Sequence, residues 1–86
     1  MLILIPLIKE YTMMRRFKIV EGKSAKFWQI TRTGKTIEIR FGRIGANGQL
    51  LKQVLPDDAA AIRHADKLIG DKLTNGYSEV RTRTPA

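Results

Sequence analysis

The chain has 86 residues, contains no cysteine and carries a formal net charge of +8. A chain of this length forms one small domain, and the lack of cysteine excludes disulfides, thiolate metal sites and thiol catalysis. The excess of lysine and arginine favours a polyanionic partner; charge that serves only solubility is the alternative interpretation.

The first thirteen residues are predicted to be an extension outside the domain. Their apolar run, Met1–Ile8, is interrupted by Pro6, has no basic start and is followed by no small-residue cleavage site. It is also far shorter than the ~20 residues of a membrane span. An added edge strand, a disordered tail and an extension upstream of a true start at Met13 or Met14 all remain open. We therefore predict a domain over residues 14–80, a tail over residues 81–86 and no membrane segment.

Four segments of the chain are predicted to be antiparallel β-strands. Turns rich in glycine and polar residues separate them, and Asn47-Gly48 is among the strongest short-range hairpin signals. Gly34 is expected to supply the positive φ of a second tight turn. The four predicted strands cover residues 15–20, 26–33, 36–41 and 49–55.

Alternation within the two central segments predicts which side chains share a face of the sheet. Trp28 and Ile30 are expected on one face, and Trp28 is expected in the core because a tryptophan that alternates with isoleucine is usually structural. The opposite face of that strand receives Phe27, Gln29 and Thr31. In the next strand, Ile37, Ile39 and Phe41 share one face, and Thr36, Glu38 and Arg40 share the other.

A single helix is predicted from the Asp57-Asp58 pair to about Thr74. An aspartate can cap the free amides of the first turn, and both carboxylates favour the positive end of the helix dipole. Asn75-Gly76 is typical of a left-handed stop, and a short last strand is expected within residues 77–80. The predicted apolar stripe of the helix consists of Ile62, Ala65, Ile69 and Leu73 with Ala61 and Leu68.

These elements predict an α+β fold: a single twisted antiparallel sheet of about four strands with one helix packed across one face. The opposite face and the hairpin loops then remain in water. Ten cations and only two carboxylates lie between Arg15 and Lys52, whereas the helical segment from Asp57 to Glu79 is mildly acidic. The positive charge therefore belongs to the strands.

The segment Arg40–Gly45 combines an aromatic ring, a glycine and an arginine at the end of a predicted strand. A guanidinium matches phosphate oxygens in a bidentate manner, and an aromatic face can lie against a sugar or a base. Alone, the triplet Phe41-Gly42-Arg43 is a weak signal, because a β-hairpin uses the same residue types.

Several blocks in order resemble the WGR domain family, named for a Trp-Gly-Arg motif, over about residues 14–80. They are Arg15-Arg16-Phe17, Val20-Glu21-Gly22, Lys26–Ile30, Phe41–Gly45 with Gly48-Gln49, Ala65–Ile69, Lys72-Leu73 and Gly76-Tyr77. The resemblance implies a sheet-plus-helix fold, and small stand-alone bacterial proteins are among the family's forms.

In the DNA-damage-dependent poly(ADP-ribose) polymerases, the domain holds DNA at a break. The resemblance assigns the motif's sugar-stacking ring to Phe41 and its DNA-contacting and domain-contacting guanidinium to Arg43. Phenylalanine in place of tryptophan gives a smaller ring without an indole donor, and the partner domains of the polymerases are absent from this sequence.

The sequence thus predicts a nucleic-acid-binding module without catalytic activity, directed at DNA ends or the phosphate backbone and largely independent of base sequence. The predicted site consists of Phe41, Gly42, Arg43, Arg40, Lys35, Arg32 and Lys52. The alternative is a protein-interaction adaptor that uses the same Phe41-Gly42-Arg43 corner.

No catalytic residue, metal site, cofactor or small-molecule substrate is predicted. His64 is the sole histidine and has no acid positioned beside it, and Asp57 and Asp58 fit capping better than acid–base chemistry. A cytoplasmic monomer or weak dimer, without membrane contact, is expected.

Overall fold

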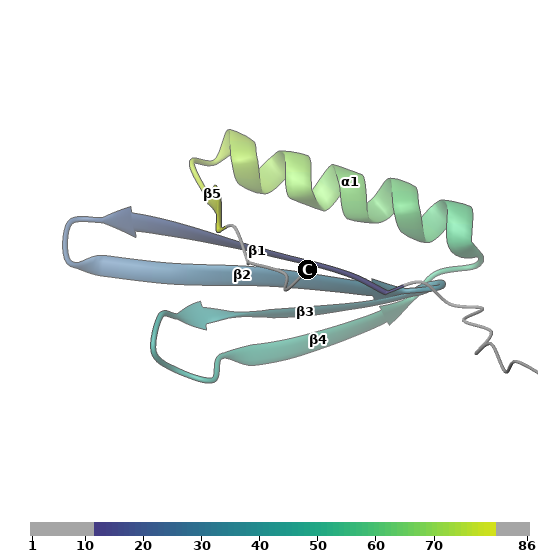
Figure 1. The fold of residues 1–86 in the computed structure, drawn as a ribbon, viewed down its shortest axis with the longest axis horizontal. Helices are drawn as coiled ribbons and strands as arrows, with labels where there is room; N and C mark the ends of the chain where they lie inside the picture. Colours follow the sequence, from purple (N-terminus) through teal and green to yellow (C-terminus); the bar gives the residue numbers. More distant parts are fainter. Residues whose placement is uncertain (1–11, 81–86) are drawn as a thin grey trace, which may run out of the picture.

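A computed structural model of the protein describes residues 12–80, so the predictions for the first eleven residues and for the tail 81–86 lie outside the described residues. Within these residues, five strands and one helix follow one another (Figure 1). They are β1 (Thr12–Glu21), β2 (Ser24–Thr33), β3 (Thr36–Arg43), β4 (Gln49–Val54), α1 (Asp58–Thr74) and β5 (Ser78–Val80). β1 begins two residues before the predicted domain boundary at Met14.

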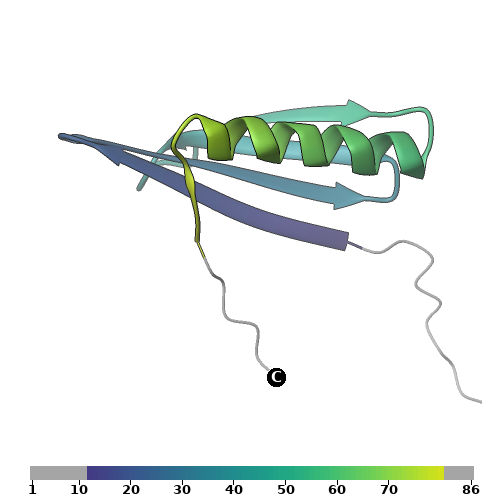
Figure 2. The same ribbon diagram turned by 90° about the horizontal axis from the view of Figure 1, so that it is seen from above.

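The five strands form one antiparallel sheet in the order β4-β3-β2-β1-β5. The first four strands form a meander, and the chain then passes through α1 to bring β5 to the outer edge of β1. α1 lies across one face only (Figures 1 and 2). The predicted α+β architecture is confirmed, with five strands where about four were expected.

Local chemistry accounts for the turns and for the ends of the helix. Gly34 has φ +61° in the β2–β3 turn, which confirms its predicted role. Asp57 is the N-cap of α1, and its carboxylate accepts a hydrogen bond of 2.8 Å from the amide of Ala60. The helix ends at Thr74, and the amide of the C-cap residue Asn75 donates to the carbonyl of Asp71.

The face of α1 that reaches the sheet differs in part from the predicted stripe. Ala61, Ala65 and Ile69 are buried, whereas Ile62 and Leu73 remain 44% and 48% exposed. The buried positions follow one i, i+4 row, and two of them are alanines. Small side chains let the helix lie close to β2 and β3, so the bulkier residues on either flank stay outside.

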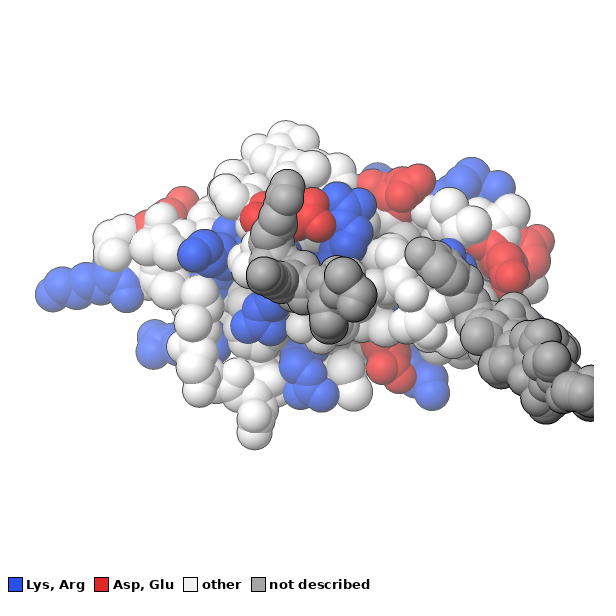
Figure 3. All heavy atoms as spheres, viewed as in Figure 1, with Lys and Arg blue, Asp and Glu red and all other residues white. Residues whose placement is uncertain are grey.

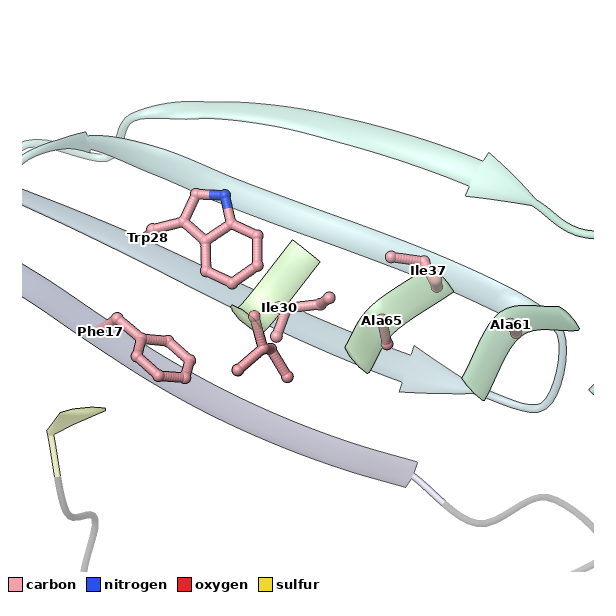
Figure 4. Close-up of a cluster of buried hydrophobic side chains, with 7 residues drawn as sticks. Phe17, Trp28, Ile30, Ile37, Ala61 and Ala65 are labelled. Carbon is pink, nitrogen blue, oxygen red and sulfur yellow. The ribbon is translucent and has the colours of Figure 1, made fainter. Parts of the chain in front are cut away.

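The core lies between α1 and the sheet (Figure 4). Phe17, Ile30 and Ile37 are fully buried, and Trp28 is buried as predicted. The rings of Phe17 and Trp28 are tilted with their centroids 5.7 Å apart, a favourable aromatic geometry. This one-sided core fixes which face of the sheet is left uncovered.

Candidate nucleic-acid interface

We call the side of the sheet away from α1 the open face. Residues directly opposite each other in an antiparallel sheet share a face. Arg16 lies opposite Gln29 and Gln29 lies opposite Arg40, so these three form one row across β1, β2 and β3. The open-face cations are Arg16, Lys18, Arg40 and Lys52.

One aromatic ring is buried on this open face. Phe27 is only 2% exposed, although it lies on the side that α1 does not cover. The guanidinium carbon of Arg16 lies 4.4 Å from the Phe27 ring centroid, and Arg16 Nη1 donates to Gln29 Oε1 at 3.1 Å. The predicted strand faces are confirmed, but the burial of Phe27 on the open face was not predicted.

The connection between β3 and β4, residues 44–48, also covers Phe27. A Cβ on Gly48 would lie 2.9 Å from Phe27 Cζ, and a Cβ on Gly42 would lie 2.8 Å from the Cα of Gly48. The two glycines therefore let this loop approach the sheet closely, since any side chain would overlap its surroundings. Gly42 thus serves packing in this structure.

Both guanidiniums among the open-face cations are oriented by neutral groups. Arg40 Nη1 donates to the carbonyl oxygen of Asn47 at 3.1 Å, and Arg16 is held by Gln29. Within residues 12–80 the ion pairs are Arg15–Glu79 and Lys67–Asp71, neither of which includes an open-face cation. The carboxylate nearest in register is Glu38, opposite Lys52.

Phe41 and Arg43 lie on the other side of the sheet from Arg40. Phe41 is opposite Trp28 and packs, half-buried, against the core. Arg43 is opposite Lys26 and is exposed at the end of β3. The ring therefore offers an outside partner only the part that the core leaves accessible.

The predicted site residues do not form one continuous patch. Phe41, Gly42, Arg43 and Arg40 lie together at the end of the sheet that carries both the turn at 22–23 and the connection at 44–48, which we call the hairpin end. Lys52 lies further along the open face. Arg32, opposite Ile37, and Lys35 lie towards the other end, roughly 20 Å and roughly 26 Å from Arg43 at ~3.3 Å per residue of β-strand. Arg32 Nη1 is engaged with the carbonyl of Gly34 at 2.8 Å.

The predicted site omitted three cations that the structure brings to the open face or the hairpin end: Arg16, Lys18 and Lys26. The signal was present in the sequence, since Arg16 and Lys18 flank Phe17 and so must share the face that Phe17 avoids. Figure 3 shows cations distributed along the sheet and at its hairpin end, and acids mainly around the helix.

Other kinds of site find little support in the described part of the chain. Residues 12–80 contain no group of three or more His, Asp and Glu side chains arranged to hold a metal ion. No helix in this range is long and apolar enough to span a membrane.

The fold and this surface define a small sheet-and-helix domain with a cationic face that no other element of residues 12–80 covers. The chain belongs to the WGR family: the WGR domain model matches residues 11–84. The family resemblance noted in the sequence is thereby confirmed.

Three similar proteins place the chain in context. It is 31% identical over 67 residues to the Escherichia coli protein YfeS and 36% identical over 66 residues to the Escherichia coli protein YehF. These matches cover 78% and 77% of this chain but 28% and 24% of the two relatives.

A crystal structure of a Bacteroides fragilis protein matches with a TM-score of 0.77 at 33% identity, over 80% of this chain and 20% of that chain. The chain thus spans about a quarter of the length of the curated relatives, and the activity of a whole protein of this kind is a matter for proposal.

Proposed function

We propose that this domain binds nucleic acid, with DNA as the preferred ligand, and that binding is largely independent of base sequence. The observation that carries the proposal is the set of open-face cations: four positive side chains on an uncovered β surface, none ion-paired within residues 12–80. Membership of the WGR family supports it. A phosphate backbone would supply the counter-charge.

The hairpin end is proposed to add two contacts. Arg43 is exposed and could bind a backbone phosphate, with Lys26 beside it. The accessible part of the Phe41 ring could lie against a terminal sugar or base, more weakly than a fully exposed ring would. Because Phe41 also packs on the core, its two roles must be separated experimentally.

Recognition by phosphate contacts, not base edges, follows from the shape of the domain. Direct readout commonly places a helix in the major groove. Here the row Ala61, Ala65 and Ile69 of α1 is buried against the sheet, and the helical segment is mildly acidic. The proposed module acts by binding and performs no catalytic step.

Titration of labelled blunt duplex, single strand and circular duplex at several salt concentrations tests the proposal. If about four phosphates are neutralised, log K should fall with log salt at a slope near −3.6. Lys18→Ala and Lys52→Ala should each reduce the magnitude of the slope by about one. Arg63→Ala on α1 removes the same charge at a position away from the open face and serves as the matched control.

A slope near zero, or equal losses for Lys18→Ala and Arg63→Ala, would contradict the open-face assignment. Arg43→Ala tests the hairpin end separately, and it should reduce the preference for blunt over circular duplex. The observation that favours the protein-adaptor alternative is Ile44, an apolar side chain that is 44% exposed and follows Arg43 in the chain. A stoichiometric protein partner that survives nuclease treatment and depends on Ile44 would favour the adaptor.

A further inference from the structure

Strand β4 is an edge strand with unusual exposure. Within residues 12–80 it pairs with β3 alone. All six of its residues are exposed, and Leu50, Leu51 and Val54 are 51%, 54% and 60% exposed. Edge strands normally carry several charges, a proline or a bulge that discourages further pairing. Between Gln49 and Val54 only Lys52 acts in this way.

The direction of the outer backbone groups follows from one hydrogen bond. The amide of Leu55 donates to the carbonyl of Lys35 at 2.8 Å, so these two residues form a hydrogen-bonded pair next to the Thr36–Val54 pair. Hydrogen-bonded and non-hydrogen-bonded pairs alternate along an antiparallel ladder. Leu50, Lys52 and Val54 therefore point their amides and carbonyls outward, away from β3.

The same three residues share the open face. Their side chains form the series apolar, cationic, apolar at alternate positions. A strand laid antiparallel beside β4 would place its own alternate residues directly opposite them. The complementary series is apolar, acidic, apolar.

We propose that β4 binds an extended acidic segment of a partner polypeptide, which adds to the sheet as an antiparallel strand. Backbone hydrogen bonds to Leu50, Lys52 and Val54 would hold the strand, and side-chain alternation would select it. The acidic position would face Lys52. This inference does not depend on DNA binding.

Charge argues against a second copy of this chain as the occupant. Symmetric pairing through the outward groups places Lys52 opposite the Lys52 of the other copy when it is centred on Lys52, and diagonal to it when it is centred on Leu51; like charges are destabilising where they are directly opposite and still close where they are diagonal. Each chain also carries a net charge of +8. An acidic segment meets attraction at the same place.

The test uses a labelled peptide, Thr-Ile-Thr-Glu-Thr-Ile-Thr, and fluorescence polarisation with the full chain. N-methylation of its Glu, whose amide would face β4, should weaken binding roughly tenfold, because a hydrogen bond is lost at a close contact. N-methylation of a neighbouring Thr, whose amide would face away, should have little effect. These changes leave the protein's own folding unaltered.

A charge exchange tests selection. Lys52→Glu should weaken the Glu peptide and strengthen a Lys peptide, each by roughly three- to tenfold. Arg63→Glu makes the same charge change on the helix and should alter the two affinities equally little. Both variants are to be checked by circular dichroism.

Three results would overturn the proposal. Binding that ignores the position of N-methylation would reveal electrostatic adsorption in place of strand addition. No saturable binding of the Glu peptide would exclude the partner. Self-association in sedimentation that Leu50→Lys abolishes would assign the edge to a second copy.

Discussion

Gly48→Ala tests whether the close approach of residues 44–48 to the sheet maintains the hairpin end. Gly48 has φ +78°, and a Cβ there would overlap the carbonyl oxygen of Phe41 and lie 2.9 Å from Phe27 Cζ. Gly45, in the same loop, also has a positive φ of +99°, but a Cβ there would meet nothing within 4 Å beyond its chain neighbours. The two substitutions therefore differ mainly in the room that the surroundings leave for the added Cβ.

The expected costs follow from this difference. A left-handed backbone costs an L-residue about 1–2 kcal/mol, which applies to both positions. Overlap with a backbone carbonyl cannot be relieved by rotating a side chain, so Gly48→Ala bears an additional overpacking cost of about 1–3 kcal/mol. We expect a loss of about 2–5 kcal/mol in unfolding free energy for Gly48→Ala and about 1–2 kcal/mol for Gly45→Ala.

Urea unfolding, followed by Trp28 fluorescence and by circular dichroism, measures both losses from the shift in midpoint. Because a small domain has only about 5 kcal/mol or slightly more of stability, sulfate should be added to both samples equally. Equal losses for Gly48→Ala and Gly45→Ala would refute the argument that the loop packs against Phe27 and the β3 backbone.

Three further predictions concern Phe41, the β1–β5 contact and the helix cap. Phe41→Leu should cost less than about 1.5 kcal/mol of stability and should lower DNA affinity at a temperature where the variant is still fully folded; unchanged affinity would exclude a ring contact. Arg15 donates to Glu79 through Nε and Nη2 at 2.9 and 2.8 Å, and a double-mutant cycle with Arg15→Gln and Glu79→Gln should give a coupling of about 0.5–1 kcal/mol for this exposed pair. The hydrogen-bonded carboxylate of Glu79 raises the pKa of Arg15, so the contribution of this ion pair to stability is lost only when pH rises through that raised pKa. The Arg15–Glu79 coupling energy should therefore be equal at about pH 7 and about pH 10. A smaller coupling energy at the higher pH would contradict this. Asp57→Ala should cost about 1 kcal/mol through loss of the cap, whereas Asp58→Ala should cost less in the same thermal melts.

Much of the fold could be predicted from local patterns. Alternation around Trp28 and Ile30 predicted the strand faces, and the Asp57 cap predicted where the helix begins. Each of these signals depends on neighbours within a few residues, so the sequence contains the necessary information directly. The helical stripe was predicted only in part, because the spacing of apolar residues does not tell which flank of a helix meets the sheet.

The candidate site was harder to predict, since it depends on which strands become neighbours. Arg16 and Arg40 are far apart in the chain, and only the register of β1, β2 and β3 brings them into one row across Gln29. The same register separates Arg32 and Lys35 from the hairpin end. The sequence alone assigned the cations to the strands, but it did not show which of them become neighbours.

Composition and periodicity by themselves determined that this chain forms a single sheet with one covering helix and concentrates positive charge on the strands. Tertiary structure decided that Phe27 is buried beneath Arg16 and the 44–48 loop, and that β4 lies at an edge of the sheet formed by residues 12–80. The reason is physical: alternation is a property of a few consecutive residues, whereas burial and strand order depend on contacts that form only when distant segments pack together.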